Sequence, residues 1–229
     1  AIGTVSLPAL AKALKKRNIL KVRNIQNKSM QLSLLFSLPA SLGLIICSKE
    51  IVSALFGYGS FSEENVNLTS EALKYFGYGI PAFALIKVLS NFYFARDNTK
   101  IPFYLSVSVV TINVLLSLSL FKEIGFIIIP IATSISTWCG VILYIILLYK
   151  KSFLIFDQNF MNNVLKIIFS TILMSLVLIY GLNFLEKSLE YSDKFKSIYL
   201  LFIVSFVATI YLISCYLLGI LKIKSYKIN

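Results

Sequence analysis

Histidine is absent from this 229-residue sequence, and acidic side chains are scarce, with ten Asp and Glu against 22 Lys and Arg. Without histidine, neither a Ser-His or Cys-His catalytic arrangement nor a histidine-ligated metal site can form. The few acidic residues are scattered along the chain. A membrane-embedded enzyme acting on polyprenyl phosphates would need clustered carboxylates for metal binding and acid–base work, so this class is disfavoured.

Cysteine is also rare. The three cysteines, Cys47, Cys139 and Cys215, each fall within an apolar run. An odd number of thiols in such surroundings is unlike a disulfide framework. We therefore expect them to be small core residues with free thiols.

What the chain has in abundance is apolar surface: 58% of its residues are hydrophobic, 14% are charged, and the mean hydropathy is +0.83. The apolar runs are continuous and long enough to cross a bilayer, which predicts an all-α integral membrane protein rather than a barrel. The formal net charge of +12 comes from lysines and arginines between those runs. That pattern orients helices in a membrane and does not indicate nucleic-acid binding.

Six complete spans are expected after a partial one. The opening letters AIGTVSLPALAK read as the last turns of a helix, so we expect the C-terminal part of a longer protein. Loops rich in Lys and Arg are expected in the cytoplasm, and the net-acidic segment 49–71 outside. The C-terminus, with Lys222, Lys224 and Lys227, is expected to be cytoplasmic. The expected spans cover about residues 30–48, 72–95, 103–121, 125–149, 164–184 and 198–221.

The basic segment before the first complete span has two interpretations. Its apolar residues Leu14, Ile19, Val22 and Ile25 are spaced to share one helical face, as in an interfacial helix. A solvated linker fits the same composition equally well.

One cation interrupts an otherwise apolar span. Lys87 lies nine residues before Arg96, which is about 13 Å along a helix and close to mid-depth in a bilayer. Asn91 follows one turn later on the same face. Snorkelling or pairing with a neighbouring helix are the alternatives, but a charge at this depth favours a polar interior, and we predict that this helix lines a cavity.

Several segments resemble one family. GTVSLPALAK, FSLPASLGL, LFGYGSF and, most specifically, FYFARDNTKIP are similar to segments of the C-terminal half of MurJ (MviN), the bacterial flippases for lipid II, the undecaprenyl-pyrophosphate-linked peptidoglycan precursor. The resemblance is strong over residues 1–149 and rests on topology alone beyond them.

The resemblance implies a two-lobe exporter fold in the bacterial cytoplasmic (inner) membrane, working by alternating access, with no enzymatic activity. This chain would hold the second helical lobe, while the N-terminal lobe would lie outside it. Residues 1–29 would be a helix end and basic cytoplasmic loop, 30–158 the four-helix lobe core, and 159–229 two additional helices with a groove for the lipid tail. Membrane lipids would be the other partners.

Site residues follow from the same resemblance. Where relatives commonly have an essential arginine ahead of the LPA motif, this chain has Gln31, and Lys28 is the nearby residue that could supply the charge. Asn113, Ser117 and Thr133 match polar positions between helices where some relatives are thought to bind sodium, although no carboxylate accompanies them here. Hydrogen bonding that packs the two helices together is the alternative. Sodium or the membrane potential would drive transport, and no other cofactor is expected.

Two further functions stay open. The resemblance places the family in the multidrug/oligosaccharidyl-lipid/polysaccharide exporter superfamily, and a relative in that superfamily could carry a lipid-linked O-antigen oligosaccharide or a drug. A purely structural scaffold is the other, and the intramembrane Lys87 and Asn113 count against it.

Overall fold

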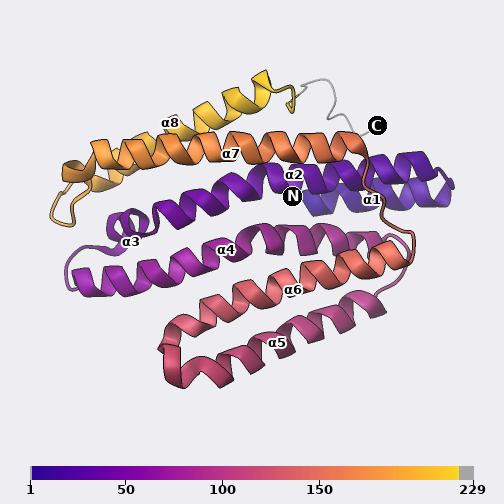
Figure 1. Ribbon diagram of the computed structural model, residues 1–229, viewed down its shortest axis with the longest axis horizontal. Coiled ribbons are helices and arrows are strands. Elements are labelled where there is room, and N and C mark those ends of the chain that lie inside the picture. Colours follow the sequence, from indigo (N-terminus) through magenta and orange to yellow (C-terminus); the bar gives the residue numbers. More distant parts are fainter. Residues whose placement is uncertain (1, 222–229) are drawn as a thin grey trace.

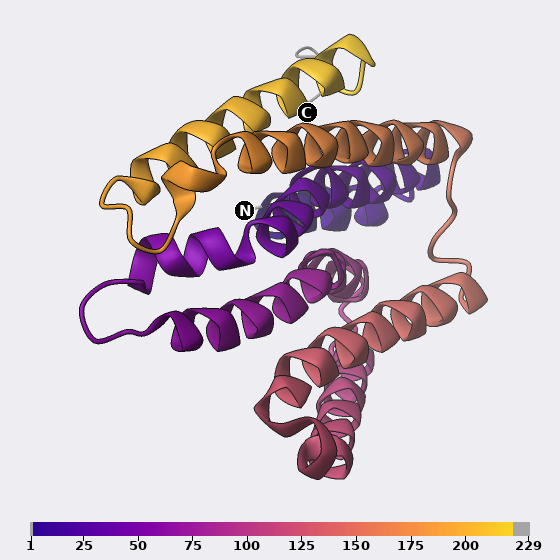
Figure 2. The same ribbon diagram turned by 60° about the vertical axis from the view of Figure 1, so that its left-hand side comes forward.

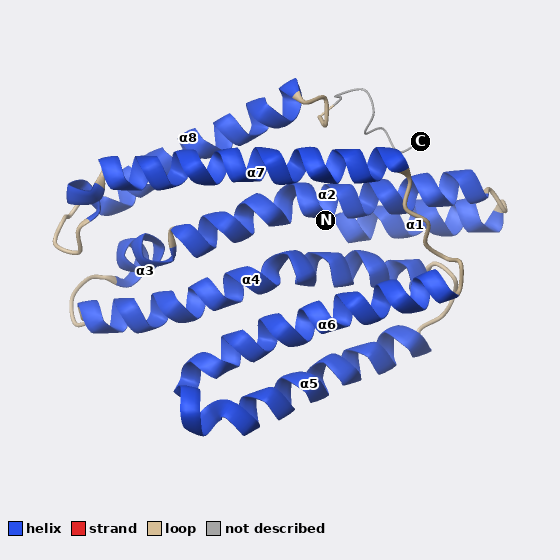
Figure 3. Cartoon of the chain, viewed as in Figure 1, coloured by secondary structure: helices blue, strands red, loops and turns tan. Residues whose placement is uncertain are grey.

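A computed structural model describes residues 2–221, which form an entirely helical bundle (Figures 1 and 3). Lys222, Lys224 and Lys227, expected to anchor the C-terminus, lie outside the described residues. In chain order the helices are α1 (Ile2–Lys15), α2 (Ile19–Ile46), α3 (Ser48–Phe56), α4 (Glu63–Phe94), α5 (Lys100–Ile124), η1 (Gly125–Ile127), α6 (Ile128–Lys150), α7 (Gln158–Phe184), η2 (Glu186–Leu189) and α8 (Lys196–Leu217).

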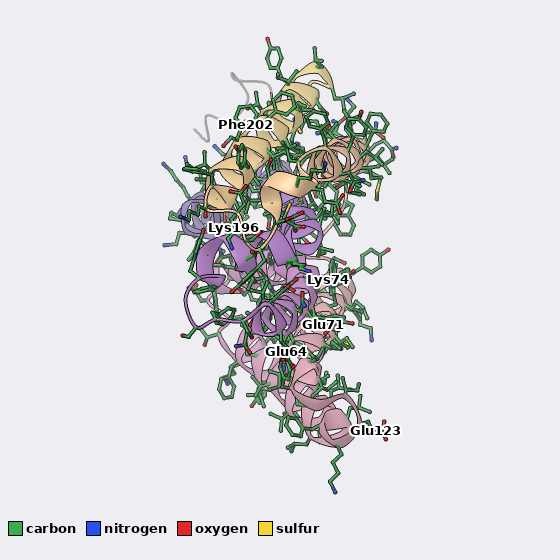
Figure 4. All side chains as sticks on the ribbon, turned by 90° about the vertical axis from the view of Figure 1, so that its left-hand side faces the viewer. Glu64, Glu71, Lys74, Glu123, Lys196 and Phe202 are labelled. Carbon is green, nitrogen blue, oxygen red and sulfur yellow. The ribbon has the colours of Figure 1, made fainter. Side chains whose placement is uncertain are left out.

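The long helices run back and forth between two ends of the bundle (Figure 1). At one end, here called the basic end, lie the α1–α2 turn, the α4–α5 turn and the α6–α7 connector, with Arg17, Arg96 and Lys151. At the opposite, acidic end lie the start of α4 with Glu63 and the connection between α7 and α8 with Glu186. Figure 4, viewed from the acidic end, also places the hairpin residue Glu123 there. Each turn thus returns the chain to the other end, as consecutive membrane crossings require.

Five segments are long and apolar enough to cross a membrane: Ile19–Ile46, Glu63–Phe94, Lys100–Lys150, Gln158–Phe184 and Lys196–Leu217. The 51-residue third segment contains two helices, α5 and α6, which fold back on each other at η1 as a hairpin (Figure 2).

Two helices begin earlier than their hydropathy predicts. The basic segment is mostly helical rather than a loop, since only residues 16–18 separate α1 from α2. At 28 and 32 residues, α2 and α4 are about 42 and 48 Å long, which exceeds a hydrocarbon core of about 30 Å. Hydropathy detects only the part that crosses lipid, whereas backbone hydrogen bonding continues into polar sequence up to the caps Asn18 and Ser62.

Two prolines inside the helices leave carbonyls that neighbouring helices satisfy. Pro39 and Pro81 cannot donate to the carbonyls four residues earlier, those of Leu35 and Gly77. The Tyr211 hydroxyl of α8 donates to the Leu35 carbonyl at 2.6 Å, and the Ser41 hydroxyl of α2 donates to the Gly77 carbonyl at 2.7 Å. In lipid, where water cannot replace the lost donor, such partners allow a helix to continue through proline.

Two groups of buried side chains meet on α2. The first joins α1, α2, α4 and α6 and includes Val22, Leu89 and Tyr144; the second joins α2, α7 and α8 and includes Leu35 and Ile203. Helix α2 therefore connects the last two helices to the rest of the bundle. All three cysteines are free, which confirms the prediction of no disulfide.

At the acidic end a buried lysine ties α8 to the α3–α4 loop (Figure 4). Lys196 is 1% exposed; its Nζ donates to the carbonyls of Gly57 at 2.9 Å and Tyr191 at 2.7 Å. The same Nζ lies 4.5 Å from the Tyr58 ring centroid and 4.6 Å from that of Tyr191. Carbonyl dipoles and aromatic faces thus replace water around this cation.

Candidate functional site

Lys87 lies on an exposed apolar stripe of α4. Phe76, Phe83 and Phe94 are 41%, 50% and 38% exposed, and their spacing of seven and four residues around Lys87 puts all four on one face. Lys87 itself is exposed, and its Nζ forms no hydrogen bond or ion pair with the described residues. An unpartnered cation in an apolar stripe is unusual in a membrane helix, because a charge in lipid needs a polar environment.

The position of Lys87 along α4 also fits mid-membrane. Lys87 is the only charged residue between Lys74 and Arg96, which are separated by about 33 Å. Lys87 is about 20 Å from the first and about 13 Å from the second by the same rise per residue. A lysine stem is too short to bring the ammonium to either headgroup layer without tilting the helix.

Neighbouring helices hold the preceding half of α4 firmly. Besides the bond from Ser41, the Ser134 hydroxyl donates to the Tyr75 carbonyl at 2.6 Å, and the Trp138 indole donates to the Tyr78 carbonyl at 2.9 Å. A Cβ at Gly79 would come within 2.8 Å of the Ser134 Oγ. Gly79 therefore allows close approach of α6, and Gly77 allows close approach of α2, where a Cβ would come within 2.8 Å of Ile45. These contacts hold the part of α4 that precedes Lys87.

Asn91, predicted to share a cavity-lining face with Lys87, is 8% exposed and has a contact of its own within the bundle. The structure does not set the two side chains on one open face: Lys87 is exposed, and Asn91 is buried.

Gln31 and Lys28, the other predicted cavity residues, lie on α2. Gln31 is 8% exposed, and its Oε1 accepts a hydrogen bond from Asn163 of α7 at 3.1 Å. Lys28 is half-buried and also has an interaction partner. Their assignment to the headgroup site stays a prediction.

Sequence reasoning missed the role of the preceding polar residues of α2. Gln26 Nε2 donates to the Phe153 carbonyl at 2.9 Å, and Asn27 Nδ2 donates to the Ile155 carbonyl at 3.2 Å. These bonds fasten the α6–α7 connector along α2. In the sequence, only the run of polar residues next to the apolar part of this helix could have indicated that role.

The predicted sodium residues come together in part. Asn113 Nδ2 of α5 donates to the Thr133 Oγ1 of α6 at 2.9 Å, and Thr133 Oγ1 donates to the Ile129 carbonyl at 2.7 Å. The Ser117 Oγ, one turn beyond Asn113, is buried without a hydrogen-bond partner among the described residues. The amide and hydroxyl oxygens would suit a hard cation only in part, because no carboxylate joins them.

Comparison with known proteins agrees with this architecture. The model of the lipid II flippase MurJ family matches residues 1–201. A probable lipid II flippase MurJ of Rhizobium tropici is 33% identical over 180 residues, which cover 79% of this chain and 34% of the relative. That of Buchnera aphidicola subsp. Baizongia pistaciae is 25% identical over 99% of this chain and 45% of the relative.

A solved structure of lipid II flippase MurJ in an inward closed conformation superposes with a TM-score of 0.77. It is 25% identical, and the match covers 95% of this chain and 42% of that one. The chain thus spans less than half the length of these relatives. A family model that matches nearly nine-tenths of the sequence, together with this shared helical arrangement, shows that the chain belongs to the lipid II flippase MurJ family.

Proposed function

We propose that the protein to which this chain belongs moves lipid II across the bacterial cytoplasmic membrane by alternating access, and that this chain supplies its second helical lobe. Family membership supports the substrate. The observation that carries the proposal is Lys87, an exposed cation on an apolar stripe of α4 that has no partner in the described part of the chain.

The chemistry of the cargo suits that position. Lipid II carries its headgroup on a pyrophosphate, and an ammonium in a low-dielectric cavity attracts such an anion more strongly than it would in water. The ammonium is a compact charge with three donors, which lets it follow a moving phosphate without a fixed geometry. Lys87 would therefore attract the headgroup into the cavity without holding it rigidly, with Lys28 and Gln31 as further lining candidates.

The membrane arrangement is part of the proposal. Because α5 and α6 would each cross the membrane, the five apolar segments would make six membrane crossings. The basic end and the C-terminus would face the cytoplasm. Residues 30–158 would form the lobe core, and residues 159–229 a pair whose exposed apolar side chains, such as Phe169 and Phe202, could border the prenyl tail.

Coupling to sodium is a separate proposal at Asn113, Ser117 and Thr133. It is supported by the unpartnered Ser117 hydroxyl beside an amide–hydroxyl pair. If sodium binds, thermal melting of the full-length protein should shift upward in NaCl relative to KCl, and Ser117→Ala should reduce that shift. Equal melting in both salts would instead favour the membrane potential as the driving force.

The alternative cargoes are a lipid-linked O-antigen oligosaccharide or a drug. The test is to supply the full-length gene to a bacterium depleted of its own lipid II flippase. Restored growth and a return of lipid II to its normal cellular level are expected. If a well-inserted protein restores neither, the cargo is another anionic lipid-linked sugar or a drug, and the lipid II proposal fails.

A further inference from the structure

A second cationic site lies at the basic end of the bundle, away from Lys87. A pocket of about 250 Å³ opens between the α1–α2 turn, the end of α4 and the α6–α7 connector. Three arginines line it, together with apolar side chains and two neutral polar ones. Those arginines are Arg17, Arg23 and Arg96. No acidic residue lines the pocket, and none of the three forms an ion pair with any residue in the range 2–221.

Arg23 carries an unused donor in this pocket. Its Nη2 donates to the Phe156 carbonyl at 3.3 Å, while its Nε is buried without a hydrogen-bond partner in the described part of the chain. A buried donor that lacks an acceptor costs about 1–3 kcal/mol, and more when it is charged. An anionic oxygen within the pocket would remove that cost.

Arg96 is fixed in place from two sides. Its guanidinium lies 4.2 Å from the centroid of the Phe153 ring, and it donates to the Phe92 carbonyl. Gln26 in turn holds the Phe153 backbone. A guanidinium whose plane is already ordered loses little further entropy when it meets a phosphate.

Two of the lining residues have a left-handed backbone conformation. Arg17 and Ser152 have φ values of 53° and 54°, in the left-handed region that favours glycine, and they terminate α1 and α6. A residue in this conformation is a common way for a helix to end, and Asp97 ends α4 in the same way. Helix α2 begins at this pocket, whereas α1, α4 and α6 end at it, so the positive field in the pocket comes from the arginine side chains and not from the helix dipoles.

The surroundings point to a membrane surface as the source of the anion. Ile19, which lines the pocket, is 76% exposed, and the adjacent Leu20 is 80% exposed. Aliphatic side chains left open beside arginines suit the boundary between acyl chains and headgroups. We propose that this pocket binds the phosphate of an anionic phospholipid in the leaflet at the basic end. The site does not depend on the transport function proposed above.

The test uses the purified full-length protein in a neutral detergent. Its melting temperature is measured with short-chain phosphatidylglycerol, with phosphatidylcholine of the same chain length, and with inorganic phosphate. Phosphatidylglycerol should raise the melting temperature by several degrees at concentrations where phosphatidylcholine has little effect. Arg23→Gln should weaken the apparent affinity for phosphatidylglycerol about tenfold, whereas Lys15→Gln, an exposed residue outside the pocket, should leave it unchanged.

Arg23→Lys keeps the charge but loses the planar fork, so it should retain part of the affinity. If Arg23→Gln does not yield a monodisperse protein, Arg17→Gln at the exposed rim makes the same test. Equal protection of the wild type and the glutamine variant by phosphatidylglycerol would overturn the site. Equal protection by inorganic phosphate, lost in the same variant, would support a phosphate site and overturn its lipid source.

Discussion

Two lysines of this chain sit in opposite environments. Lys196 is enclosed by two carbonyls and two tyrosine rings, so its charge is fully used within the protein. Lys87 has no such partners within residues 2–221 and is exposed on an apolar stripe. The first arrangement stabilises the junction of α8 with the α3–α4 loop, and the second leaves a charge available to a ligand.

Replacing Lys196 should therefore affect stability. Lys196→Met removes two charge-assisted hydrogen bonds and leaves both carbonyls without their donor, at a cost of about 2–4 kcal/mol. Thermal melting of the full-length protein in detergent should fall clearly. The exposed neighbour Lys194 is the control, because Lys194→Met changes the same net charge and should leave the melting temperature nearly unchanged. Equal melting temperatures of the two variants would show that the contacts of Lys196 do not stabilise the protein.

Glu50 of α3 is the acidic counterpart. Burial raises the pKa of its carboxyl, which a backbone hydrogen bond and Lys49 only partly oppose, and its Oε2 is buried without a hydrogen-bond partner among the described residues. Because the pKa in the folded protein exceeds the unfolded value, ionised Glu50 destabilises the fold at neutral pH. That cost disappears as the pH falls through the raised pKa.

Glu50→Gln should accordingly raise the melting temperature at pH 7.5, by an amount corresponding to about 1 kcal/mol. The difference from wild type should shrink as the pH is lowered. Melting curves between pH 7.5 and pH 4.5 test this, with the exposed Glu64→Gln as control. A difference that stays constant with pH would contradict the assignment to this carboxyl.

At the scale of the elements, hydrogen bonds between helices form where proline interrupts the hydrogen bonding within a helix. Pro39 and Pro81 each free one carbonyl, and the donors that satisfy them, Tyr211 and Ser41, come from neighbouring helices. Each bond therefore repairs one helix and fastens a second helix to it. The junction between α2 and α8 depends on such a bond.

Tyr211→Phe should destabilise the protein by about 1–2 kcal/mol, because the Leu35 carbonyl is then buried without a donor. The loss should be smaller in a Pro39→Ala background, since the backbone N–H of an alanine at that position can donate to the same carbonyl. Melting of the four members of this double-mutant cycle measures the coupling. Additive losses would show that the hydroxyl does not act through the carbonyl that Pro39 leaves free. Tyr216→Phe, at an exposed position on the same helix, should be neutral.

At the scale of the whole molecule, the helices that cross the membrane could be predicted from the sequence, since long apolar runs have no other stable form in lipid. The polar extensions of α2 and α4 could not, because hydropathy falls where helical hydrogen bonding continues. Lys87 could be identified from the sequence because it is the one charged residue within its apolar run. The contacts of Lys196 and the donors to the carbonyls freed by proline could not be identified from the sequence, because they join distant residues. Lys196 and Gly57 are 139 positions apart, and Tyr211 and Leu35 are 176 positions apart.

The central claim is that Lys87 attracts an anionic headgroup within a transport cavity. The most direct measurement is the amount of lipid II exposed on the outer leaflet of flippase-depleted spheroplasts that express the full-length gene. Lys87→Met should reduce that exposure at least tenfold at equal membrane abundance, Lys87→Arg should retain much of it, and Lys74→Met, an exposed lysine nearer the acidic end, should match wild type. Wild-type exposure of lipid II by Lys87→Met would contradict the account.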